Sequence, residues 1–358
     1  MKSGGVSSPY VGEQFNTLVH SGTPQNKKAT EKGAVIVKGS GTLVTKKTMD
    51  RRATTKTITQ PLVLELIKVA EAKGRDKKYI QSYRNTFYCQ SRIHSFEGKI
   101  FGKYCKTRFC PVCCGIRKAE IINKYLPVIN EWETPHFVTL TTKAVPSKLL
   151  DKRVKEMNIV FRKIKDKYRK WHTKGKSIKL IGIKSLECNF NPANKTYNPH
   201  FHIIVPNKVT ANLLKQEWCK YWGYSIANKE AQDIQEIYDP EKCLVEIIKY
   251  GTKIFTDPTM QKNSEKKGSP IIYVSAIDNI IWAMKPHRIF ERFGFNLPTK
   301  PKIKGGKSQT ITDYDEWVHD PKQNDWINTK DTDQLLTGYV ITGELLNLLE
   351  NNIDTEIE

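Results

Sequence analysis

Two histidines share one side of a short apolar run, YNPHFHIIVPN (residues 197–207). Side chains alternate between the two faces of a β-strand, so His200 and His202 point one way while Phe201 and Ile203 point the other. Two imidazoles on one face form half of a divalent-metal site or an acid–base site. The competing interpretation is a pair of surface histidines on an exposed strand face.

A glutamate in the preceding segment is the candidate third ligand. SIKLIGIKSLECNF (177–190) has the composition of a strand, and a short polar turn joins it to the histidine strand. The antiparallel hairpin that this implies brings Glu187 close to the two histidines. Two imidazoles and a carboxylate suit Mg²⁺ or Mn²⁺ and leave open positions for phosphate oxygens. Alternatively, Glu187 is a strand-edge residue that pairs with a lysine.

A tyrosine that could act as a nucleophile lies in CLVEIIKYGTK (243–253). On a helix, Glu246 and Tyr250 are four residues apart and share a face. Lys249 and Lys253 form an adjacent basic row. A tyrosine phenolate can attack a phosphodiester if a metal ion withdraws charge from the phosphoryl group, and a nearby carboxylate can then activate water or a 3′-OH. The ordinary alternative is a tyrosine that only packs in the core or on the surface.

Four cysteines with the spacing of metal ligands precede these motifs. They are Cys89 and, within CKTRFCPVCC, Cys105, Cys110 and Cys113. A tight C-P-x-C turn with two further thiolates suits tetrahedral, structural Zn²⁺. Arg108 and Arg117 surround this segment with positive charge and are candidate DNA contacts. The fourth ligand is open, because His94 or Cys114 could replace Cys89.

The charge of the chain is distributed unevenly. It has 59 Lys and Arg residues against 37 Asp and Glu residues, a formal net charge of +22. Residues 1–60 carry 10 basic and 3 acidic side chains, and residues 311–358 carry 2 basic and 12 acidic ones. The positive excess therefore lies in the middle of the chain. A region this basic is typical of a polyanion-binding surface, although a generally basic proteome is a weaker alternative explanation.

The apolar and cysteine patterns indicate a compartment. No apolar segment follows Met1, and the most hydrophobic later run, PIIYVSAIDNIIWAM, is short and is interrupted by Asp278. We therefore expect a cytoplasmic protein without a membrane span. Four of the eight cysteines lie within residues 105–114, which favours reduced thiols and metal ligation over disulfides.

The sequence predicts an α+β domain with helices packed on an antiparallel sheet. Strands are expected at 136–145, 177–190, 201–205 and DIQEIYD, and helices at about 61–84, 147–172, 210–223 and 240–255. Four parts are expected along the chain. They are a flexible basic arm (1–60), a helix with the zinc-binding segment (61–130), the main domain (131–300) and an acidic C-terminal tail with a helix (301–358).

Taken together, the motifs resemble those of plasmid rolling-circle replication initiators, the single-tyrosine branch of the HUH endonuclease superfamily. FVTLTTKAV (137–145) resembles the first strand of that family, and NPHFHIIV resembles its His-hydrophobic-His motif. EIIKYGTK is similar to its catalytic helix and CKTRFCPVCCGIRK to its cysteine–arginine segment. The resemblance covers about residues 87–295 and includes KPHRIFERFG. One departure is Asn198, where many relatives have another histidine.

The resemblance implies an RRM-like HUH endonuclease fold over residues 131–300. His200 and His202 would be metal ligands, Tyr250 the nucleophile, and Glu246 the base that assists termination. The implied activity is metal-dependent nicking of one strand at a plasmid origin through a 5′-phosphotyrosine intermediate. The implied partners are origin DNA, as duplex and as a single-stranded nick site, and a host helicase and polymerase, with homo-oligomerisation left open.

Two other functions stay open at this point. A mobilisation relaxase or an HUH transposase would use the same chemistry on a different DNA. A non-enzymatic zinc-containing DNA-binding regulator would explain the charge and the cysteines. That regulator would leave the histidine pair, Glu246 and Tyr250 without a role.

Overall fold

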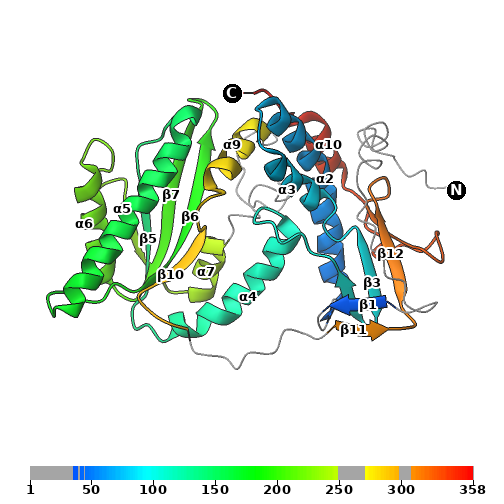
Figure 1. The fold of residues 1–358 in the computed structure, drawn as a ribbon, viewed down its shortest axis with the longest axis horizontal. Helices are drawn as coiled ribbons and strands as arrows, with labels where there is room; N and C mark the ends of the chain where they lie inside the picture. The colour runs from blue at the N-terminus through cyan, green and yellow to red at the C-terminus, as the bar shows by residue number, and fades with distance from the viewer. Residues whose placement is uncertain (1–34, 39–40, 44, 249–270, 298–307, 358) are drawn as a thin grey trace. The chain divides into compact units, whose positions relative to one another are not determined.

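The computed structural model describes residues 35–38, 41–43, 45–248, 271–297 and 308–357 of the chain. The chain divides into two compact units (Figure 1). The cysteine unit comprises Met1–Cys113, Phe255–Val274 and Lys300–Glu356. The histidine unit comprises Cys114–Ile254, Ser275–Thr299 and Ile357–Glu358. Each unit therefore contains one of the two metal-ligand sets that the sequence predicts.

A five-stranded antiparallel sheet forms the centre of the histidine unit. Its strands lie in the order β10-β6-β7-β5-β8. Their bounds are His136–Thr141 (β5), Gly182–Asn191 (β6), Thr196–Val205 (β7), Asp233–Glu236 (β8) and Phe290–Phe293 (β10). Strand β6 is buried at seven consecutive positions rather than at alternating ones. Continuous burial is expected where helices cover both faces of a sheet.

Two helices cover one face of this sheet. They are α5 (Ser147–Thr173) and α6 (Lys208–Trp222). Phe161 of α5 and Trp218 of α6 both pack against Phe201 of β7, with ring centroids 5.4 and 5.6 Å apart. The buried side chains of α5 recur every three or four residues and form an apolar stripe that faces the core: Leu150, Val154, Met157, Phe161, Ile164 and Tyr168.

The opposite face is covered by α7 (Pro240–Ile248) and by α4 (Pro111–Asn130). Figure 1 shows the sheet between these helices and the pair α5 and α6. Ile183 of β6 and Ile204 of β7 share an apolar cluster with side chains of both covering helices: Tyr125, Ile129, Leu244 and Ile247. Helix α9 (Val274–Met284) adds a bond from Asn279 Nδ2 to the Tyr197 hydroxyl, at 3.0 Å.

The cysteine unit is built on a second five-stranded antiparallel sheet, in the order β13-β12-β3-β4-β2. The strand bounds are Thr42–Leu43 (β2), Arg92–Phe96 (β3), Lys99–Gly102 (β4), Asp315–Asp320 (β12) and Asp325–Asn328 (β13). Two further strand pairs are β1 (Val35–Lys38) with β11 (Ser308–Ile311), and β9 (Ile272–Tyr273) with β14 (Ile353–Asp354).

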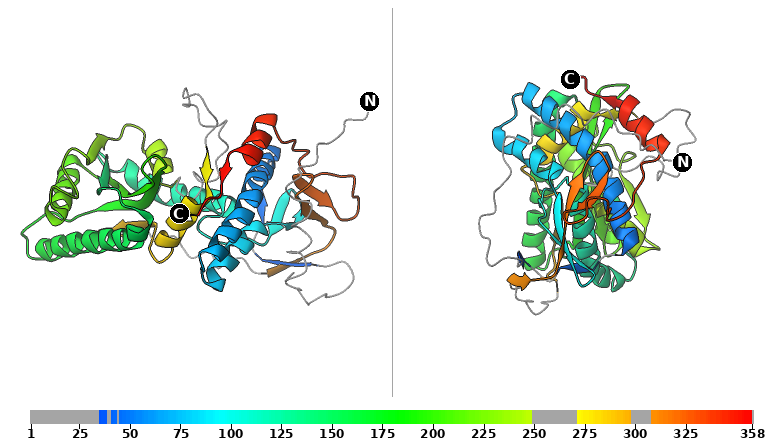
Figure 2. Two further views of the ribbon diagram at one scale, coloured as in Figure 1. Left: turned by 90° about the horizontal axis from the view of Figure 1, so that it is seen from above. Right: turned by 90° about the vertical axis from the view of Figure 1, so that its right-hand side faces the viewer.

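Three helices belong to the cysteine unit: α2 (Lys46–Ala72), α3 (Lys77–Phe87) and α10 (Gly343–Asn351). Met49 and Ala53 of α2 pack into the same buried cluster as Trp326 of β13. Helix α10 lies beside α2 (Figure 2). Helix α2 is therefore the element on which this unit is assembled.

The α+β class with antiparallel sheets is confirmed, but the single helix predicted over 61–84 is wrong. The chain forms α2 and α3 instead, and the break lies at Gly74, whose φ is +65°. Asp76 then caps α3, because its carboxylate accepts the Tyr79 N–H at 2.7 Å. Left-handed backbone at a glycine followed by an aspartate cap is a usual way to end one helix and begin another.

Helix α2 also begins earlier than expected, inside the predicted basic arm. Its first half is rich in Thr and Lys and shows no apolar period. Thr hydroxyls there donate to carbonyls one turn back: Thr54 to Asp50, Thr55 to Arg51, Thr57 to Ala53 and Thr59 to Thr55. These bonds let polar side chains enter a buried helix, so hydrophobic periodicity could not detect it. Residues 1–34 lie outside the described part of the chain.

The predicted acidic tail contributes β12, β13 and α10 to the cysteine unit. Strand β12 pairs with β3, with Trp317 opposite Ile93. The helix predicted over about 240–255 is present as far as Ile248, where the described residues stop. The division of the chain into four parts stays a prediction.

The described helices show no membrane-crossing candidate, since none is both long enough and apolar enough for that role. Helices α2 and α5 have 27 residues each, yet both contain many charged side chains.

Replacing Gly294 should destabilise the histidine unit. Gly294 follows β10 with φ of +78°, and an added Cβ would overlap the backbone carbonyl of Leu180. We expect Gly294→Ala to lower the free energy of unfolding by about 2 kcal/mol or more, measured by urea denaturation. Gly115→Ala is the matched control, because Gly115 lies in α4 and its Cβ would meet nothing within 4 Å. An unchanged transition midpoint in Gly294→Ala would contradict this account.

Candidate metal sites

The hairpin of β6 and β7 brings together the three ligands predicted from the sequence. Glu187 is directly opposite His200 in the strand register, and His202 is opposite Ser185. His202 Nδ1 lies 3.3 Å from Glu187 Oε1, and His200 Nε2 lies 3.9 Å from Glu187 Oε2. The three ligand atoms are all within 4.8 Å of one another, an arrangement that could hold a metal ion.

The orientation of His200 is fixed by a hydrogen bond behind it. Its Nδ1 donates to the carbonyl oxygen of Asn198 at 3.0 Å, and Nε2 is the ring nitrogen that lies towards Glu187. The Asn198 side chain in turn accepts a bond from Thr141 Oγ1 at 2.8 Å. In the sequence, Asn198 stands out only as a departure from a family pattern. The hydrogen bond to His200 is accepted by the backbone carbonyl of Asn198, which every residue type has, so the identity of this residue could not predict it.

The ligand group is shielded from water. The exposed fraction of the side chain is 2% for Glu187, 7% for His200 and 14% for His202. The two imidazole rings lie 4.7 Å apart, and the His202 ring also contacts Phe137 of β5 at 5.0 Å. A buried carboxylate is stabilised by positive charge nearby. Ligand atoms at right angles about 2.1 Å from a cation are about 3 Å apart, so modest contraction would close this group around one.

Three protein ligands would not complete the coordination sphere of a divalent cation. All three residues come from one face of two neighbouring strands, so they can occupy only one side of a coordination sphere. This is the face on which α7 packs. Ile183 lies four residues before Glu187 on β6, and Ile204 lies two residues after His202 on β7, so all four side chains are on one face. Ile183 and Ile204 belong to the apolar cluster that α7 completes. Half-buried Glu246 lies on α7. The predicted nucleophile Tyr250 and the predicted basic pair Lys249 and Lys253 lie outside the described residues.

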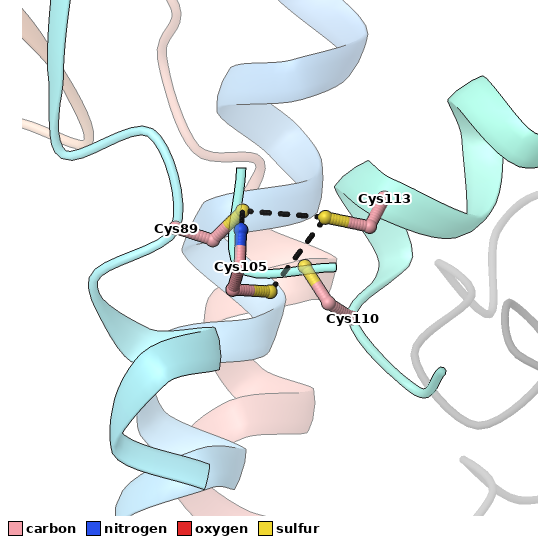
Figure 3. A group of neighbouring side chains, drawn as sticks. All are labelled: Cys89, Cys105, Cys110 and Cys113. Carbon is pink, nitrogen blue, oxygen red and sulfur yellow. Dashed lines mark hydrogen bonds between the residues drawn. The ribbon is translucent and has the colours of Figure 1, made fainter. Parts of the chain in front are cut away.

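The four predicted zinc ligands also come together, within the cysteine unit (Figure 3). Cys89 follows α3, Cys105 and Cys110 lie in the loop after β4, and Cys113 is in the first turn of α4. The Sγ of Cys113 lies 3.6 Å from that of Cys89 and 3.6 Å from that of Cys105. Thiolates that share one tetrahedral zinc ion are about 3.8 Å apart. All four are free of disulfides.

The environment of this cluster suits thiolates. Backbone N–H groups donate to sulfur, from Cys105 to Cys89 at 3.5 Å and from Lys106 to Cys113 at 3.3 Å. The second donor depends on left-handed backbone at Lys106, whose φ is +60°. The pKa of the Cys105 thiol is lowered because the thiols of Cys110 and Cys113 hydrogen-bond to its sulfur, and the same bonding to Cys105 raises the pKa of Cys110 and of Cys89. The N-terminus of α4 adds favourable dipole charge near Cys113.

The alternative fourth ligands are not in this group. His94 instead lies 3.7 Å from the carboxylate of Glu316, and burial lowers its pKa. Cys114 is buried but does not join the four-sulfur cluster. Arg108 is exposed in the loop of the cluster, and Arg117 is half-buried on α4. The geometry therefore favours Cys89 as the fourth sulfur.

One buried cation near the sulfurs was missed by sequence analysis. Lys56 of α2 is 3% exposed, and its Nζ donates to the Cys89 carbonyl oxygen at 2.9 Å. Burial lowers its pKa to about 8, and attraction to Cys89, Cys110 and Cys105 opposes that shift. A lysine in a Thr-rich helix carries no sequence signal for such a position.

A mixed α+β chain with a four-cysteine cluster and a Glu–His–His cluster defines a class of candidate metalloproteins. Comparison with protein families is more specific, since a family model described as "Replication protein" matches residues 100–291. That match covers more than half of the chain, which therefore belongs to this replication-protein family. The matched segment contains the whole Glu–His–His cluster and three of the four clustered cysteines, and Cys89 lies before it.

Curated relatives carry the name "Protein rep". One from Staphylococcus aureus is 33% identical over 166 residues, which are 42% of this chain and 69% of the relative. One from Bacillus amyloliquefaciens is 28% identical over 179 residues, or 42% of this chain and 51% of the relative. One from a Bacillus species is 26% identical over 200 residues. The chain spans 51% and 64% of the two Bacillus relatives. No solved structure matches the chain.

Substitution of the cysteines tests which sulfurs hold a metal. We expect Cys89→Ser to abolish tetrahedral Co²⁺ absorption at equimolar metal, because a hydroxyl is a poor fourth ligand for a soft site. Cys114→Ser should keep the wild-type spectrum. Full Co²⁺ binding in Cys89→Ser together with a loss in Cys114→Ser would show that the fourth ligand is Cys114.

Proposed function

We propose that the chain is a plasmid rolling-circle replication initiator with the HUH endonuclease fold. It would bind origin DNA, nick one strand and hold the new 5′-phosphate on Tyr250. The observation that carries this proposal is the convergence of Glu187, His200 and His202 on the sheet face that α7 covers. Membership of the replication-protein family and the basic charge of the chain agree with it.

A divalent cation, Mg²⁺ or Mn²⁺, would be held by Glu187, His200 and His202 and would neutralise charge on the scissile phosphate. Tyr250 Oη forms the new bond to phosphorus as the bond to the 3′-oxygen breaks. The tyrosine loses its proton, and the departing 3′-oxygen gains one and becomes the primer end. A strand that reaches this buried group must be unpaired, so a single-stranded nick site is expected.

Glu246 is the proposed base that ends the reaction. It lies one helical turn before position 250, so a helix that continued past Ile248 would place both on one face. The carboxylate would take a proton from water or from a 3′-OH, which then attacks the phosphotyrosine and releases the tyrosine. Lys249 and Lys253 are proposed phosphate contacts.

The cysteine cluster is proposed to hold a structural Zn²⁺ ion. Four sulfurs close the coordination sphere, so no position remains for substrate. The ion would fix the loop that presents Arg108 and the start of the helix that carries Arg117. These arginines are proposed contacts to duplex origin DNA. A host helicase and polymerase would act on the nicked product.

Other proteins could use the same residues. A relaxase or HUH transposase would share the chemistry, so the DNA substrate distinguishes them from an initiator. A DNA-binding regulator would need no nucleophile, so activity itself distinguishes it.

Removing one oxygen atom tests the proposed nucleophile. We expect Tyr250→Phe to abolish the covalent protein–DNA adduct while duplex origin binding changes less than about twofold, because only the nucleophilic oxygen is removed. The measurement uses labelled hairpin substrates with Mn²⁺ and denaturing gels. Tyr238→Phe is the control, since Tyr238 is 87% exposed. An adduct that persists in Tyr250→Phe and disappears in Tyr238→Phe would move the nucleophile to Tyr238.

Metal titration tests the Glu–His–His cluster. We expect His202→Ala to raise the Mn²⁺ concentration for half-maximal nicking by about tenfold or more, because one of three protein ligands is lost. His172→Ala, at the exposed end of α5, should leave the titration unchanged. Overlaid curves for His202→Ala and the wild type would refute a metal role for this cluster.

A further inference from the structure

Two buried cations lie on one face of α2, next to the segment that carries Cys89. Arg52 and Lys56 are four residues apart and are 9% and 3% exposed. Lys56 Nζ donates to the carbonyl oxygens of Cys89 and Phe87, at 2.9 and 3.5 Å. Arg52 Nη1 donates to Gln90 Oε1 at 3.4 Å. Both side chains therefore contact the short turn that positions this sulfur.

Neither cation pairs with a carboxylate in the described part of the chain. A buried ammonium group with only carbonyl partners is strongly destabilised unless negative charge lies close by. Cys89, Cys110 and Cys105 are the groups whose negative charge attracts Lys56. Because Lys56 Nζ bonds to the backbone carbonyl of Cys89 itself, its charge lies close to the sulfur cluster.

With zinc bound, the charges balance when all four cysteines are ionised. Four thiolates around one Zn²⁺ carry a net charge of −2, and Lys56 and Arg52 together carry +2. Four protonated thiols would leave both cations uncompensated. Backbone N–H groups of Cys105 and Lys106 donate to two of the sulfurs, but these groups are dipoles without net charge. Lys56 adds a full positive charge, which the backbone donors do not supply.

We propose that Lys56 is a positioning residue of the zinc site. Its ammonium group holds the turn that carries Cys89, and its positive charge offsets the negative charge of the four thiolates. Helix α2 lies outside the segment matched by the family model, residues 100–291, so metal affinity depends on a part of the chain that this match does not cover. The inference rests on the zinc site proposed above.

The test measures zinc affinity of the full chain by competition with a chromophoric chelator. Lys56→Met removes the charge at similar length, and we expect it to weaken zinc binding about 10- to 100-fold, as loss of an outer partner of a metal site does. Lys56→Arg keeps the charge and should stay within about threefold of the wild type. Lys47→Met, at an exposed position of the same helix, is the control.

A second measurement separates charge balance from packing. Thermal unfolding is followed with zinc bound and after the metal is stripped. We expect Lys56→Met to lower the Tm of the zinc-bound protein and to leave that of the stripped protein unchanged or higher, because an uncompensated buried charge is removed. A residue that only packs would lower both.

The outcomes test the zinc site and the role of Lys56 separately. A wild-type protein that binds no zinc would refute the site, and the role of Lys56 with it. Wild-type zinc binding with unchanged affinity in Lys56→Met would refute the role of Lys56 alone. Equal losses of affinity in Lys56→Met and Lys56→Arg would also overturn it, since charge would then not matter.

Discussion

The pairing register between β6 and β7 is the constraint on which the Glu–His–His cluster depends. It sets Glu187 opposite His200 and extends from Ile183 with Ile204 to Asn191 with Thr196. A shift of one residue would turn Glu187 to the other face, where Phe201 packs. Because Ile183 and Ile204 are buried under α4 and α7, such a shift would also expose core residues. Core packing and ligand geometry are therefore specified by the same hydrogen bonds.

A buried charge pair lies on the opposite face of the sheet and joins β6 of this hairpin to β10. Lys184 of β6 is 1% exposed, lies over the Phe201 ring at 4.0 Å and pairs with Glu291 of β10 at 3.4 Å. Burial lowers the pKa of Lys184 to about 8, and Glu291 opposes that shift. A chain that needs two strands in fixed register gains from such a partner-specific contact, because it ties the edge strand β10 to β6.

The two metal clusters differ in a way that follows from their ligands. Four soft sulfurs around one point, with backbone donors behind them, would form a closed site around zinc, which suits a structural role. Two imidazoles and a carboxylate on one face would leave coordination positions open around a hard cation, as the proposed phosphate chemistry requires. The cysteine cluster further joins three separate stretches of chain, after α3, after β4 and at the start of α4.

The sequence by itself determined which residue types could act together. The two-residue step between His200 and His202, the C-P-x-C turn and the apolar stripe of α5 each predict their local geometry, because strand and helix periods are local properties. Only the tertiary structure decided that Cys89, rather than His94 or Cys114, completes the sulfur cluster. It also decided that the Thr-rich residues before Gln60 form a buried helix that carries Lys56 to that cluster. These outcomes depend on contacts between segments far apart in the chain, and the spacing of neighbouring residues contains no information about them.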